Sequence, residues 1–140
     1  MYKFVDFVSK RVAEDIEPKS DWIIISINEP LSITNLKEGW LDILPLTFED
    51  LDIRLNDYLI FNNDDAKQII DFVEKYENQA STIIVHCHAG ISRSAAVAKF
   101  IAEKYDLKFN HNYFLYNKLV YKILNEVERE ETKSIINKLL

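Results

Sequence analysis

The chain contains one cysteine, Cys87, whose neighbours are suited to phosphate chemistry. It lies in "IIVHCHAGISRS", residues 83–94, where an apolar run ends and a glycine and an arginine follow. Gly90 can adopt the backbone angles of a tight loop, and the planar guanidinium of Arg93 can hold two oxygens of one phosphate group. A thiolate held beneath a phosphate in this way would be a nucleophile facing the phosphorus atom.

The segment 87–92 is expected to be a loop between a strand and a helix. Residues 81–86, "STIIVH", are too few and too rich in β-branched residues for a helix, and the alanines that follow Ser92 favour one. Backbone N–H groups of such a loop can converge on one anion, with the positive end of the helix dipole behind them, and the same donors favour the thiolate of Cys87. The residues expected to bind the phosphate are His88, Ala89, Gly90, Ile91, Ser92 and Arg93.

Other segments predict the elements that hold this loop. Further strands are expected over 2–8, 21–28 and 39–46, although Pro45 cannot donate to a ladder, and 47–63 is expected to be mostly loop. Further helices are expected from Ser9 to about Ile16, from Asp65 to about Gln79, beyond Asn110, and, as a short last helix, over 131–140. The alternation predicts one α/β domain over 1–140, with a central, mostly parallel sheet of four or five strands flanked by helices.

Composition limits the partners of this domain. The 140 residues carry a net charge of −6, which argues against general affinity for nucleic acid or an anionic membrane, so an anion site must be local. Acids at Asp6, Glu14 and Asp15 interrupt the first segment, where a signal peptide would be apolar, and no apolar run approaches 18 residues. One cysteine cannot form an intrachain disulfide. A cytoplasmic location is therefore expected.

Residues 86–94, "HCHAGISRS", resemble the H-C-x-x-G-x-x-R-S signature of the cysteine-based protein tyrosine phosphatases. The position of the signature, two thirds along a short chain, is more similar to the small dual-specificity type, and the resemblance extends over about 22–105. It implies that Cys87 forms a phosphocysteine intermediate, that Arg93 binds the equatorial oxygens, and that Ser94 bonds the sulfur. His86 would orient the loop. The resemblance implies no metal and no cofactor.

The family also uses an upstream aspartic acid, which protonates the leaving oxygen and later activates water. The candidates are Asp50, Asp52 and Asp57. We favour Asp50, in "LPLTFED", because it follows soonest after the third expected strand, where the acid loop of the family begins. The segment departs from the W-P-D form of the receptor-like members.

The resemblance predicts a phosphatase for phosphotyrosine in proteins or peptides, with phosphoserine and phosphothreonine as further candidate substrates. Family members that act on phosphoinositides or RNA 5′-phosphates often carry extra basic residues in the loop, which are absent from the variable positions here. A non-catalytic phosphate-binding module is the main alternative. Arsenate reduction and sulfur transfer are disfavoured because such reductases commonly need further thiols. The alternative for His86 is a core histidine with a structural role only, and for His88 solvent exposure is as well supported as a substrate contact.

Overall fold

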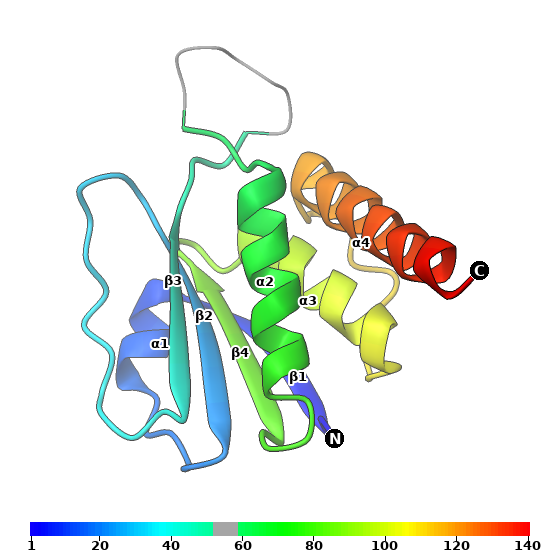
Figure 1. Cartoon of the computed structure of the whole chain (residues 1–140). Helices are drawn as coiled ribbons and strands as arrows, with labels where there is room; N and C mark the ends of the chain where they lie inside the picture. Colours follow the sequence, from blue (N-terminus) through cyan, green and yellow to red (C-terminus); the bar gives the residue numbers. More distant parts are fainter. Residues whose placement is uncertain (52–58) are drawn as a thin grey trace.

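The computed structural model of the chain describes residues 1–51 and 59–140. Its sheet contains β1 (Phe4–Ser9), β2 (Trp22–Asn28), β3 (Asp42–Thr47) and β4 (Thr82–Cys87). The strand order is β1-β4-β2-β3, and every neighbouring pair is parallel (Figure 1). The predicted α/β class and the parallel central sheet are confirmed, with four strands.

The helices are α1 (Lys10–Asp15), α2 (Asn63–Lys75), α3 (Arg93–Tyr105) and α4 (Lys118–Leu139). Figure 1 shows α1 on one face of the sheet, and α2, α3 and α4 on the other. The larger apolar core lies between the sheet and these three helices. A smaller apolar cluster, in which Ala13 of α1 packs with Ile24 and Ile84, lies between α1 and the other face of the sheet. Among the described residues, no helix combines the length and apolar character needed to cross a membrane.

Strand burial follows the position of each strand in the sheet. Both faces of the two central strands are covered, so β4 is buried along its whole length and β2 at all but its end residues. The outer strand β3 is only partly buried, and it includes Pro45, opposite Ser26 of β2. A proline is tolerated there because an edge strand has one side without ladder hydrogen bonds.

Two helix boundaries differ from the sequence-based expectation. Helix α2 begins two residues before the expected Asp65, because Asn62 is the N-cap and forms a capping box with Asp65. It ends at Lys75, earlier than predicted. The separate last helix expected over 131–140 is wrong, because α4 continues to Leu139 through a segment that contains neither glycine nor proline.

Candidate active site

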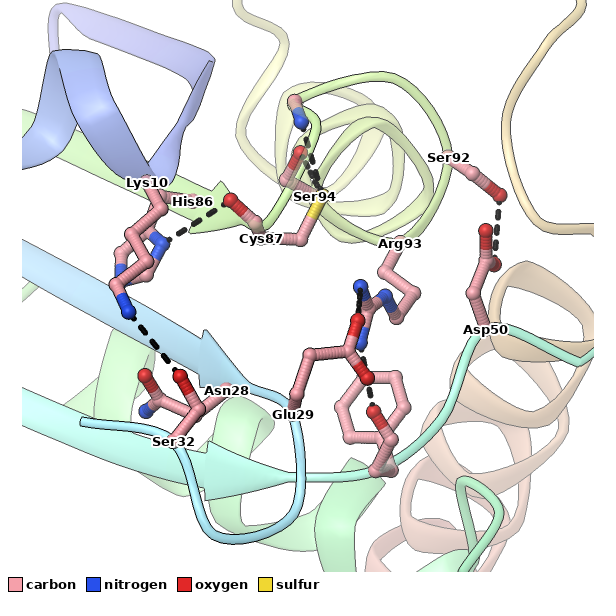
Figure 2. Close-up of polar contacts among 12 residues, drawn as sticks. Lys10, Asn28, Glu29, Ser32, Asp50, His86, Cys87, Ser92, Arg93 and Ser94 are labelled. Carbon is pink, nitrogen blue, oxygen red and sulfur yellow. Dashed lines mark hydrogen bonds and ion pairs between the residues drawn. The ribbon is translucent and has the colours of Figure 1, made fainter. Parts of the chain in front are cut away.

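Cys87 is the last residue of β4, and α3 begins at Arg93, so residues 88–92 form the connection, called the anion loop below. It is one residue shorter than the expected loop over 87–92, because β4 includes Cys87. Because β4 is a central strand, this loop lies at the carboxyl edge of a parallel sheet, where α/β proteins commonly bind ligands. The Cys87 side chain is buried. Its Sγ accepts the Gly90 N–H at 3.3 Å and lies 3.1 Å from Ser94 Oγ (Figure 2).

The anion loop packs directly on the end of β1. Gly90 has a φ of +71°, and a Cβ atom placed there would lie 2.4 Å from the backbone nitrogen of Ser9. The Ser9 side chain caps α1, and the next residue, Lys10, donates its N–H to the His88 carbonyl at 3.2 Å. Only glycine can combine this positive φ with so short a distance to the backbone of β1, which explains why residue 90 is a glycine.

Tyr113, from the segment before α4, also contacts the anion loop. Its hydroxyl donates to the Ile91 carbonyl at 2.5 Å, and its ring packs on Phe7 of β1, with 5.1 Å between the ring centroids. Burial raises the pKa of Tyr113, and the electrostatic interaction with the nearby Cys87 raises it further. The phenol therefore stays protonated and can keep donating to the loop.

Arg93 is fixed at the first position of α3 with only 4% of its surface exposed. Its Nη1 donates to the Phe48 carbonyl at 2.8 Å, and its Nη2 lies 2.6 Å from Glu29 Oε1 (Figure 2). Its Nε is buried, and no described residue accepts a hydrogen bond from it. A buried donor without a partner is costly, and a phosphate oxygen would satisfy it.

His86 is fully buried beneath the loop, and both of its ring nitrogens have partners. Nε2 lies 2.6 Å from Ser26 Oγ of β2, and Nδ1 lies 3.3 Å from the carbonyl oxygen of Cys87. Burial lowers the pKa of His86, so the ring is neutral at pH 7. The side chain thus joins the backbone of the Cys87 residue to the neighbouring strand.

The favoured acid, Asp50, is exposed and lies beside the anion loop. Ser92 Oγ donates to Asp50 Oδ1 at 2.8 Å, and Asn117 Nδ2 donates to the same oxygen at 2.8 Å. Figure 2 shows the Asp50 carboxylate facing Ser92 at the start of α3. The other two candidates, Asp52 and Asp57, lie outside the described residues.

The remaining loop side chains face outward. His88, Ala89 and Ile91 are exposed, so they can contribute backbone N–H groups to an anion and side chains to the rim of the site. Sequence reasoning missed Glu29 and Asn117. Glu29 follows β2, the neighbour of β4, so its side chain emerges at the same edge of the sheet as Cys87, but this relation depends on the strand order and has no local sequence signal.

A family model described as "Dual specificity phosphatase, catalytic domain" matches residues 34–133. The chain belongs to this phosphatase family. The matched range includes the favoured acid, β4, the anion loop and most of α4. The segments β1, α1 and β2 and the residue Glu29, which also contact the site, lie before it.

Solved structures resemble the phosphatase fold of this chain at low sequence identity. The human tyrosine phosphatase-like serine/threonine/tyrosine-interacting protein is 20% identical, with a TM-score of 0.55, and the match covers 81% of this chain and 80% of that one. Tk-PTP in its active form is 17% identical, with a TM-score of 0.42, over 97% of this chain and 88% of that chain. No curated protein matches the chain in sequence. At such identities the first likeness supports the fold, and the family assignment rests on the family model.

Proposed function

We propose that the chain hydrolyses phosphotyrosine, and also phosphoserine and phosphothreonine, in proteins, through a phosphocysteine intermediate. The observation that carries the proposal is the buried Nε of Arg93, a donor without a partner among the described residues, at the start of the helix that follows Cys87. Loop N–H groups and this guanidinium together offer the donors that a phosphoryl group needs in its transition state. A cytosolic location and a phosphorylated protein partner go with this proposal.

In the first step, Cys87 Sγ attacks phosphorus while the bond between phosphorus and the ester oxygen breaks. The sulfur begins this step as the acceptor of the Gly90 N–H, which orients it at the centre of the loop. Asp50 supplies the proton that the departing oxygen takes up, so that a neutral alcohol or phenol leaves. Arg93 holds two of the three equatorial oxygens and neutralises the charge that spreads over them.

In the second step, a water molecule attacks phosphorus and Asp50 accepts its proton. The sulfur–phosphorus bond breaks, which releases inorganic phosphate and restores the thiolate. The Ser94 hydroxyl, 3.1 Å from Sγ, donates to the sulfur as its negative charge returns. His86, neutral and held by Ser26, keeps the backbone of the Cys87 residue in place and takes no part in proton transfer.

A protein substrate is favoured by the rim of the site. The exposed loop side chains are His88, Ala89 and Ile91, and none of them carries a permanent positive charge. Polyanionic substrates such as phosphoinositides or RNA 5′-ends would be expected to need further basic groups there. The apolar Ile91, 47% exposed, is better suited to contact the peptide around a phosphorylated side chain.

The experiment that tests the nucleophile is hydrolysis of a small aryl phosphate by the wild type, Cys87→Ser and Arg93→Lys. Cys87→Ser should abolish turnover while vanadate still binds, and Arg93→Lys should be severely impaired because an ammonium cannot make the two-pronged contact. Arg129→Lys, on the exposed side of α4, is the matched control and should keep the wild-type rate. Turnover by Cys87→Ser above a few percent of wild type would rule out this mechanism. Vanadate binding without any wild-type turnover would identify a phosphate-binding module instead.

The acid is tested by leaving groups of different basicity. Asp50→Asn should slow hydrolysis of tyrosyl phosphate by roughly a hundredfold, with a smaller effect on an activated phenol that leaves without a proton. It should also remove the basic limb of the pH profile of turnover. Asp52→Asn and Asp57→Asn serve as matched comparisons, and a leaving-group effect in either of them instead would move the acid along the loop.

A further inference from the structure

Asn117, the residue before α4, connects three segments around the site. Its side-chain oxygen accepts the Val120 N–H at 3.0 Å and so caps the helix, while its Nδ2 donates to Asp50 Oδ1 at 2.8 Å and to the Leu51 carbonyl at 2.9 Å. Its backbone N–H donates to the Ser92 carbonyl at 3.0 Å. Only 4% of the residue is exposed, so it has little freedom to move. The acid segment, the anion loop and α4 therefore meet at one amide.

The hydrogen bonds to Asp50 distinguish its two oxygens. Both side-chain donors, Ser92 Oγ and Asn117 Nδ2, reach Oδ1, and within residues 1–51 and 59–140 no hydrogen bond reaches Oδ2. An oxygen that already accepts two hydrogen bonds is a poor place for a proton, since both lone pairs are occupied. The proton that Asp50 would deliver is therefore carried by Oδ2.

We propose that Asn117 is a positioning residue for the general acid: it fixes the Asp50 carboxyl group so that the protonated Oδ2 faces the leaving oxygen. This inference rests on the proposed role of Asp50. Without Asn117, the exposed Asp50 side chain could turn about its χ angles, because its other partner, the Ser92 hydroxyl, can rotate with it. Asn117 cannot follow such a rotation, since the other end of its amide caps α4 and its backbone holds Ser92.

The loss of this contact should affect the proton-transfer step more than the attack by sulfur. A displacement of about 1 Å in a reacting group can cost on the order of a hundredfold in rate. The attack depends on Cys87, Arg93 and the anion loop, and no side-chain atom of Asn117 contacts these groups through a hydrogen bond. A substrate whose leaving group needs no proton should therefore be turned over almost normally.

Asn117→Ser and Asn117→Asp test the inference, because both replacements keep an oxygen that can cap α4. Serine is too short to reach Asp50. Aspartate has the shape of asparagine but lacks the amide donor and sets a second carboxylate beside Asp50. For both variants we expect kcat for tyrosyl phosphate to fall by roughly tenfold to a hundredfold, with little loss on an activated phenyl phosphate. Asn125→Ser, elsewhere on α4, is the matched control. Its side chain donates to the Tyr121 carbonyl on the same helix, so its rates should equal the wild type.

A double variant separates this inference from the assignment of the acid. In an Asp50→Asn background, Asn117→Ser should cause no further loss, because its effect passes through Asp50. If Asp50→Asn shows the leaving-group effect and Asn117→Ser does not, the positioning role is refuted and the acid stands. Equal loss by Asn117→Ser on all leaving groups would also refute it, since that pattern indicates a general structural role. If Asp50→Asn itself shows no effect, the assignment of the acid fails first.

Discussion

Replacement of Gly90 by alanine should damage both stability and turnover, because this residue has two separate reasons to be glycine. Its φ of +71° is a conformation that costs an L-residue about 1 to 2 kcal/mol. In addition, the new Cβ would lie 2.4 Å from Ser9 N and 2.6 Å from the carbonyl carbon of Val8. These are roughly 1 Å inside normal contact distances, and both atoms belong to the backbone of β1, which cannot rotate away.

The overlap sets the expected magnitudes. Forced crowding of this kind typically adds about 1 to 3 kcal/mol, so the free energy of unfolding should fall by about 2 to 5 kcal/mol in total. The alternative is that the anion loop moves away from β1 by roughly 1 Å, which would withdraw the Gly90 N–H from Cys87 Sγ and reduce kcat/KM by about a hundredfold. Equilibrium unfolding in urea and hydrolysis of an aryl phosphate measure the two effects.

Gly39→Ala provides the matched control for this variant. Gly39 also has a positive φ, +116°, but a Cβ there would meet only Pro18 Cγ at 3.4 Å and Pro18 O at 3.7 Å. This substitution should therefore lose stability through backbone strain and keep the wild-type kcat/KM. Gly90→Ala with more than half of the wild-type kcat/KM would refute the claim that the contact with β1 sets the geometry of the loop.

Two further predictions concern charged and titratable groups near the anion loop. Glu29→Gln keeps an oxygen for Arg93 Nη2 and removes a negative charge, so the concentration of phosphate that inhibits this variant should be roughly three- to tenfold lower than for the wild type. Glu29→Ala loses the contact with Arg93 and should lower kcat. Weaker inhibition of Glu29→Gln by phosphate would contradict the reasoning. For His86, burial holds the folded-state pKa below that of the unfolded chain, so the free energy of unfolding should decrease as the pH falls from about 6.5 towards 5. His86→Gln should remove this decrease, and urea titrations at several pH values would detect it; an unchanged profile would mean that another group is responsible.

Local signals predicted the position of the anion loop to within one residue. A β-branched run, a glycine, an arginine and a run of alanines are each informative over a few residues. Together they predicted a strand over 81–86 and a helix from Ser92, whereas β4 ends at Cys87 and α3 begins at Arg93. The same reasoning predicted the Ser9 cap of α1 and the parallel arrangement of strands. It failed at the end of the chain, where it divided α4 at a charged stretch, although charged residues are good helix formers.

The partners of the site residues could not be predicted in this way, because they are distant in the sequence. Glu29 reaches Arg93 across 64 positions, and Asn117 reaches Asp50 across 67. The Glu29 contact depends on the strand order, which places the ends of β2 and β4 side by side. The Asn117 contact depends on the start of α4 lying beside the anion loop, where the Asn117 N–H donates to the Ser92 carbonyl. A single asparagine before a helix is a good N-cap in any protein, so its second role at Asp50 has no local signature.

The seating of the anion loop on β1 has a consequence for the order of folding. The loop closes against β1, the first strand of the chain, and four elements, α1, β2, β3 and α2, lie between β1 and β4 in the sequence. Contacts between such distant segments form late, since a long loop must lose its entropy before they are made. Helical structure should therefore appear in refolding before the ability to bind phosphate or vanadate. An anion that binds only the completed loop should also shift the equilibrium towards the native state, so phosphate or vanadate is expected to stabilise this domain against unfolding.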